Sequence, residues 1–173
     1  AVTQLLGANP IYYSLDLSKQ GRPNLEELEL LDLSRVKLMW INYPHMPTGT
    51  LGSEQHLTAL IQFVKKHNIL LVNDNPYSFI LNDNPNSIFN IKGAKEVCLE
   101  LNSLSKSFNM AGWRVGMLLG AEQHINNVIK VKSNMDSGMF YGVQKGAIAA
   151  LKSSNDWFTS LNEVYKKRRA LVW

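Results

Sequence analysis

Four short apolar runs, separated by turn-rich or helical segments, constrain the fold of this chain most strongly. They are VKLMWIN (36–42), ILLVN (69–73), EVCLELN (96–102) and RVGMLLG (114–120). A nearly continuous apolar run of this length is typical of a strand that is buried on both faces in a parallel sheet. The pattern therefore predicts an α/β fold, a three-layer α/β/α arrangement around a mostly parallel sheet.

The clearest helix lies between the first two runs. Ser53 is a suitable N-cap, and Leu57, Leu60, Ile61 and Val64 form an i, i+3, i+4, i+7 stripe. Further helices are expected after the last run, at residues 122–133, 144–153 and 157–173. The N-terminal part is less regular: residues 7–17 predict a strand entered through a turn, and residues 21–35 fit a short helix only loosely.

Length and composition exclude several classes of protein. The 173 residues are enough for one ordinary core, and no window approaches 18 consecutive apolar residues, so no transmembrane helix is expected. The single cysteine, Cys98, excludes a disulfide framework and a thiol-rich metal site. These features favour a cytoplasmic protein without a membrane partner.

The net charge of +4 owes much to a basic run near the C-terminus, YKKRRALVW (165–173). A nucleic-acid patch would show such a run. The run continues a helical pattern and lacks a stacking motif of aromatic residues, which favours a solvated helix face. We expect no nucleic-acid partner.

Polar side chains gather where the apolar runs end. In open α/β sheets, ligands bind outside the carboxyl ends of the strands. If the strands are parallel neighbours, one sheet edge would carry a carboxylate, a phenol, two hydroxyls, an amine and a guanidinium, from Asp74, Tyr77, Ser103, Ser105, Lys106 and Arg114. The guanidinium suits a phosphate dianion, and a deprotonated lysine amine can form a Schiff base. Each residue alone would have a commoner explanation as a turn, packing or surface residue, so their joint placement carries the hypothesis of a phosphorylated ligand.

The order and spacing of these residues resemble the class I/II, fold-type-I aminotransferases, which use pyridoxal 5′-phosphate. The family motif Ser-x-Ser-Lys followed by Gly-x-Arg-x-Gly matches residues 103–106 and 112–116. Its Asp-x-x-Tyr matches residues 74–77, and its Asn-x-Pro and Pro-Thr-Gly match residues 42–44 and 47–49. The later segment SNMDSGMFYGVQKGAIAAL (133–151) is similar to the branch with LL-diaminopimelate and aspartate aminotransferases.

The resemblance implies a role for each matching residue. Lys106 would form the internal aldimine and move the proton during transfer of an amino group from an amino acid to a 2-oxo acid. Asp74 would pair with the pyridine nitrogen and Tyr77 with the phenolic oxygen of the cofactor. The phosphate would be bound by Ser103, Ser105 and Arg114. The family also implies a homodimer.

One position departs from the family pattern. The family usually has Asn immediately before Pro-Thr-Gly, where it bonds the phenolic oxygen of the cofactor, and this chain has Met46. A thioether is a poor acceptor and no donor, so the contact is lost and Tyr77 becomes the main partner of that oxygen. The neighbouring His45 is a candidate substitute.

The resemblance also predicts which part of the enzyme this chain represents. Residues 1–173 would be a partial cofactor-binding large domain that ends in the helix leading to the small domain. An N-terminal segment with a glycine-containing phosphate loop, and a small domain with an arginine for the substrate carboxylate, would be absent. We expect the fragment alone to be inactive.

Three other functions fit parts of the sequence. A carbon–sulfur lyase of the same fold shares these motifs, because the parts that separate the two reactions lie outside this sequence. An aminotransferase-like sensor domain of a transcriptional regulator would carry a winged helix-turn-helix upstream. A serine hydrolase would match the S-x-x-K spacing of Ser103 and Lys106, but the S-D-N and K-T-G elements of that class do not occur here.

Overall fold

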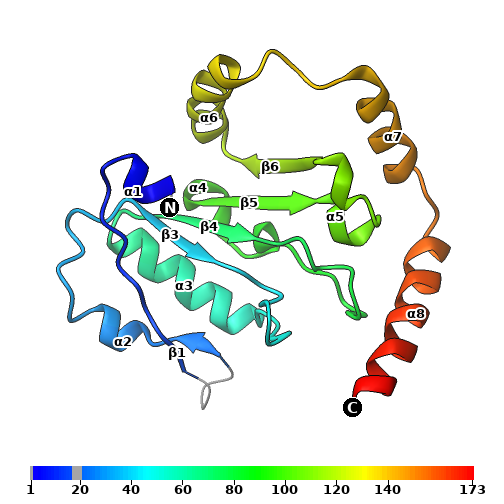
Figure 1. Cartoon of the computed structure of the whole chain (residues 1–173). Coiled ribbons are helices and arrows are strands. Elements are labelled where there is room, and N and C mark those ends of the chain that lie inside the picture. The colour runs from blue at the N-terminus through cyan, green and yellow to red at the C-terminus, as the bar shows by residue number, and fades with distance from the viewer. Residues whose placement is uncertain (1, 17–20) are drawn as a thin grey trace. The chain divides into compact units, whose positions relative to one another are not determined.

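A computed structural model describes residues 2–16 and 21–173, which fall into two compact units, 1–36 and 37–173 (Figure 1). The first unit holds helix α1 (Val2–Leu5), strands β1 (Leu15–Asp16) and β2 (Arg22–Pro23), and helix α2 (Leu25–Leu28). β1 and β2 pair antiparallel.

The strand and the helix predicted for this first unit are longer than the elements that the structure shows. The strand expected over 7–17 is reduced to β1, and residue 17 lies outside the described residues. Gly7 adopts a left-handed conformation and Pro10 has no N–H to donate to a ladder, so neither suits a strand. The helix expected within 21–35 is reduced to α2, and beyond it the Asp32 carboxylate accepts from the Ser34 amide (3.0 Å), a local bond that competes with helix formation.

A four-stranded sheet forms the centre of the second unit. Its strands are β3 (Leu38–Ile41), β4 (Leu70–Asp74), β5 (Cys98–Ser103) and β6 (Gly116–Gly120), in the spatial order β3-β4-β5-β6. The pairs β3/β4 and β4/β5 are parallel, whereas β6 runs antiparallel to β5. The predicted α/β fold with a mostly parallel sheet is confirmed.

Burial differs between the strands. Consecutive residues of β4 and of β5 are buried, from Leu71 to Asn73 and from Cys98 to Glu100, as expected for strands covered on both faces. The expectation of two buried faces was wrong for 36–42 and for 114–120, where no residue of β6 is buried. In β3, Met39 and Ile41 are buried but Leu38 and Trp40 are 49% and 54% exposed. β3 is an edge strand of this sheet, and one of its faces stays open among the described residues.

Helix α3 (Glu54–Lys66) packs against the sheet beside β4 (Figure 1). The hydroxyl of Ser53 accepts from the His56 amide (3.3 Å), which confirms the predicted N-cap. The predicted stripe is buried, with Leu60 and Val64 fully enclosed. The short elements η2 (Ile88–Asn90) and α4 (Ala94–Val97) complete the connection to β5.

The remaining elements follow β5 and β6 along the chain. They are α5 (Leu104–Ser107), η3 (Ala111–Trp113), α6 (Glu122–Met135), α7 (Tyr141–Leu151) and α8 (Asp156–Val172), and the last three confirm the helices expected after the fourth strand. Leu104, Met110, Val115 and Ala147 form a small core that joins α5 to α7. Neither α6 nor α8 has a buried residue. Within the described ranges, no helix is long and apolar enough to cross a membrane.

Candidate functional site

The reversed direction of β6 brings the predicted site residues to one edge of the sheet. Asp74 ends β4 and is level with Leu101 of β5. Ser103 ends β5 and is level with Gly116, the first residue of β6. Because β6 is antiparallel, Arg114 enters the sheet where β5 leaves it, instead of lying at the opposite edge.

Lys106 lies in a single turn of helix directly after β5. Ser103 caps this turn: its hydroxyl accepts from the Ser105 amide (3.1 Å) and donates to the Ser105 hydroxyl (2.9 Å). Leu104 and Ser107 are buried and hold the turn, whereas the side chain of Lys106 is exposed. The turn thus presents two hydroxyls and one amine from a fixed backbone.

Arg114 adopts a left-handed conformation, with φ 56° and ψ 44°. For a residue with a Cβ this conformation costs roughly 1–2 kcal/mol, so the surrounding structure holds it in place. One guanidinium nitrogen, Nη1, donates to the carbonyl of Ala111 (2.9 Å), and the side chain is otherwise exposed. The remaining N–H groups suit a phosphate.

Asp74 and Tyr77 lie on the loop that leaves β4. The carboxylate of Asp74 has no hydrogen-bond partner among residues 2–16 and 21–173, and desolvation raises its pKa above the usual 3.8. The residue's surface is largely exposed, so this desolvation is partial. A cation placed against the carboxylate would oppose the shift. Tyr77 is half-buried in the same loop.

Asn42 joins this loop to the loop that follows β3. Its Nδ2 donates to the main-chain carbonyl of Asp74 (2.6 Å), and its Oδ1 accepts from the amide of Met46 (2.7 Å). The sequence motif identified Asn42 but not this structural role. His45, the candidate substitute beside Met46, bonds within its own loop, with 2.8 Å between its Nδ1 and the hydroxyl of Thr48.

Sequence reasoning missed a buried polar network beneath the site. The carboxylate of Glu100 (4% exposed) accepts from Asn73 Nδ2 (3.0 Å), Ser87 Oγ (2.7 Å) and the amide of Ile88 (2.9 Å). Asn73 Oδ1 accepts in turn from the amide of Tyr43 (3.2 Å). The available signal was a polar residue at the end of one apolar run, Asn73, and a charged residue inside the next, Glu100. The network fixes the loop after β3 to the two central strands.

Comparison with known proteins tests the family. The profile of the aminotransferase class I and II family matches residues 1–172. This chain belongs to that family. It is 40% identical over 172 residues to an LL-diaminopimelate aminotransferase from Natranaerobius thermophilus. The matched region covers 98% of this chain and 45% of that protein. An LL-diaminopimelate aminotransferase from Dehalococcoides mccartyi is 40% identical over 169 residues, 96% of this chain and 44% of its own length.

Solved structures of aminotransferase-family proteins share the fold. BacF from Bacillus subtilis superposes with a TM-score of 0.91 at 35% identity, covering 96% of this chain and 42% of that one. A probable N-succinyldiaminopimelate aminotransferase from Thermus thermophilus gives a TM-score of 0.88 at 29% identity, covering 96% of this chain and 45% of that one. The chain thus spans slightly less than half the length of the relatives it matches.

The family uses pyridoxal 5′-phosphate, and the residues of this chain fit that group. The cofactor needs donors for a phosphate, an amine for its aldehyde and an anion for its ring nitrogen. Ser103, Ser105 and Arg114 offer the donors, Lys106 offers an exposed amine, and Asp74 offers a carboxylate without a hydrogen-bond partner in the described part of the chain. The described residues contain no cluster of three or more His, Cys, Asp or Glu that could hold a metal ion.

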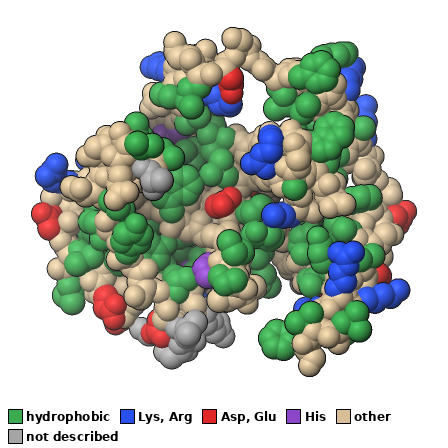
Figure 2. All heavy atoms as spheres, viewed as in Figure 1, with side chains coloured by type: hydrophobic (Ala, Val, Ile, Leu, Met, Phe, Trp, Pro, Cys, Tyr) green, Lys and Arg blue, Asp and Glu red, His purple; other side chains and the backbone are tan. Residues whose placement is uncertain are grey.

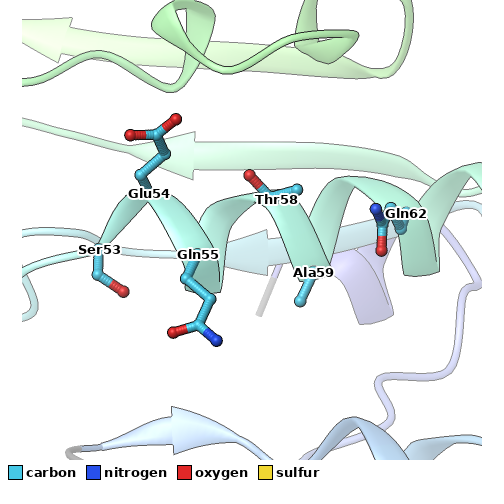
Figure 3. A pocket seen from close by; sticks show the side chains of 6 residues that line it. All are labelled: Ser53, Glu54, Gln55, Thr58, Ala59 and Gln62. Carbon is cyan, nitrogen blue, oxygen red and sulfur yellow. The ribbon is translucent and has the colours of Figure 1, made fainter.

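A hollow elsewhere on the second unit is not this site. It lies along one side of α3, as Figure 3 shows, and is lined by Ser53, Glu54, Gln55, Thr58, Ala59 and Gln62. None of the predicted site residues lines it. It is open to solvent, and its lining offers neither an amine nor a guanidinium to a phosphorylated ligand.

Proposed function

We propose that the whole protein is a pyridoxal-phosphate-dependent aminotransferase that moves an amino group from an amino acid to a 2-oxo acid. The observation that carries the proposal is the single sheet edge shared by the ends of β4 and β5 and the start of β6. That edge brings together groups that would suit the phosphate, the ring nitrogen and the aldehyde of the cofactor. Membership in the aminotransferase class I and II family supports the reaction class.

Each residue would act on a defined part of the ligand. Ser103, Ser105 and Arg114 bind the phosphate, and the Asp74 carboxylate faces the ring nitrogen. Tyr77 would donate to the phenolic oxygen. Lys106 would hold the aldehyde end of the cofactor and, as a free amine, would accept and return a proton at its Nζ. When bound, the cofactor supplies an electron sink for the substrate Cα.

LL-diaminopimelate is the first amino-acid donor to test. Curated relatives that are 36–40% identical to this chain bear the name LL-diaminopimelate aminotransferase. Exchange with a 2-oxo acid would support the aminotransferase. Release of pyruvate and ammonia from a cysteine conjugate, without exchange, would instead identify a carbon–sulfur lyase.

Three further features of the whole protein are part of the proposal. Residues 1–173 form part of the cofactor-binding large domain, and α8 leads toward a small domain.

A homodimer is supported by apolar side chains exposed on α6, α7 and their connection, at Val128, Ile129, Val131, Met135, Met139, Phe140, Tyr141, Ile148 and Leu151. Hydrophobic side chains gather over α7 in Figure 2. Light scattering of the purified whole protein measures the assembly. We also propose a cytoplasmic location, on composition alone.

The decisive experiment uses the whole protein and the variant Lys106→Ala. The wild type should bind the cofactor with visible absorbance, and borohydride should fix it to the peptide that contains Lys106. The variant should show no fixed cofactor. Lys152→Ala is the matched control, because it removes another exposed lysine, just after the end of α7. Covalent fixation in the Lys106→Ala variant would refute the assignment of this lysine.

A further inference from the structure

Helix α8 makes a direct hydrogen bond to the turn that carries Lys106. The indole Nε1 of Trp157, in the first turn of α8, donates to the main-chain carbonyl of Ser107 (2.9 Å). Ser107 follows Lys106 immediately and is only 1% exposed. The bond joins residues 50 positions apart in the sequence.

Neighbouring side chains of α8 fix the helix in place. The ring of Phe158 stacks on Phe79 (4.7 Å between centroids, 18° between planes) and meets Phe108 edge-on (5.3 Å, 65°). Asn162 accepts from the amide of Leu81 (2.9 Å) and donates to the carbonyl of Phe79 (3.0 Å). The start of α8 is therefore held both to the loop that follows Asp74 and to the segment that follows Lys106.

The turn α5 needs external partners because it has only four residues. A single helical turn is marginal alone, and its last carbonyls have no partner within the helix. Trp157 satisfies the carbonyl of Ser107, and Ser107 Oγ donates to the carbonyl of Pro76 at the long distance of 3.5 Å. On the other side of Lys106, Ser105 is bonded to Ser103 (2.9 Å). The backbone of Lys106 is thus fixed from both sides while its side chain stays exposed.

We propose that Trp157 is a positioning residue for Lys106: its indole N–H sets the place from which the lysine amine reaches the cofactor. This proposal rests on the function proposed above. The donor, rather than the bulk of the ring, carries the effect. The indole is partly exposed (38%), and the aromatic packing that anchors α8 comes mainly from Phe158.

The variant Trp157→Phe of the whole protein removes the donor and keeps a ring. Losing one neutral hydrogen bond corresponds to about a fivefold change in an equilibrium, or ~1 kcal/mol. We expect amide exchange in residues 104–109 of the cofactor-free protein to accelerate about fivefold, and the dissociation constant of pyridoxal 5′-phosphate to rise about fivefold. The pH midpoint of the visible band of the bound cofactor should move by about half a unit, a threefold change in the proton equilibrium.

Thr159→Ala is the matched control. Thr159 lies near Trp157 at the start of α8, and within the described part of the chain its hydroxyl bonds only to the carbonyl of Asn155 (3.4 Å). The control should leave exchange in residues 104–109, cofactor affinity and the pH midpoint at wild-type values. A second variant, Asn162→Ala, removes the bonds to Phe79 and Leu81 but not the indole donor, and should affect residues 104–109 less than Trp157→Phe does.

The proposal is overturned if Trp157→Phe lowers the melting temperature but leaves cofactor affinity and the pH midpoint equal to those of the control. It is also overturned if Asn162→Ala changes those two quantities more than Trp157→Phe does, because α8 would then act by anchorage alone. Failure of the proposed function has a different signature: the Lys106→Ala variant would still fix cofactor, whatever the behaviour of Trp157→Phe.

Discussion

Removing the buried carboxylate of Glu100 should destabilise the whole protein by about 3–5 kcal/mol in the variant Glu100→Ala. Three donors converge on this carboxylate: Asn73 Nδ2 and the Ile88 amide on Oε2, and the Ser87 hydroxyl on Oε1. Bonds to a charged acceptor contribute about 1.5–3 kcal/mol each, and the alanine variant leaves the two buried donors, Asn73 Nδ2 and the Ile88 amide, without it. The loop after β3 should loosen as well, because Asn73 also holds the amide of Tyr43 (3.2 Å).

Glu100→Gln is the control of equal shape. Its amide oxygen can take the place of Oε2 and keep both donors there, and the Ser87 hydroxyl can turn to accept from the new NH₂ group. We expect a loss of only about 1–2 kcal/mol for this variant, the difference between charged and neutral hydrogen bonds. Urea denaturation followed by circular dichroism measures both variants. An alanine variant within about 1 kcal/mol of the wild type, or a glutamine variant as unstable as the alanine one, would refute the reasoning.

Three further predictions concern single residues of the second unit. Cys98 should resist a thiol reagent at pH 8 until the protein is denatured, because burial raises the pKa of its thiol to about 12. The pKa of Asp74 is higher in the folded protein than in the unfolded chain, so the folded state loses stability as the pH rises from the ordinary carboxyl pKa to the folded pKa. Asp74→Asn should therefore raise the melting temperature of the cofactor-free protein at pH 7. The same variant should bind the cofactor more weakly. Gly116→Ala should cost about 1–3 kcal/mol, since the new Cβ would lie 2.8 Å from the carbonyl oxygen of Asn102; an unchanged melting temperature would contradict this.

Periodicity was enough to predict most of the second unit. The Leu57–Val64 stripe and the Ser53 cap gave α3, and the apolar runs gave four strands in the observed order along the chain. These features are local, because the hydrophobic pattern of a few neighbouring residues is enough to identify a helix face or a strand. The candidate site residues were chosen because they follow strand ends, where open α/β sheets bind ligands, and their individual roles came from the family resemblance.

Contacts between residues that are distant in the sequence could not be predicted from local patterns. Strand direction is set by the connection and not by composition, so RVGMLLG (114–120) did not reveal that β6 is antiparallel. The exposure of Trp40 depends on which strand lies at the sheet edge. The bond from Trp157 to Ser107 requires α8 to return to a turn 50 residues earlier, which no local pattern encodes.

The antiparallel pairing of β6 with β5 also bears on the order in which the molecule folds. The two strands are joined by residues 104–115 alone, whereas β3 and β4 are separated by residues 42–69, and β4 and β5 by residues 75–97. Short sequence separation lowers the entropy cost of closing a loop, and local contacts form faster than distant ones. We expect β5 and β6 to pair first, so that Ser103, Ser105 and Arg114, the proposed phosphate ligands, come together in a local hairpin-like unit before Asp74 is added by the slower parallel pairing.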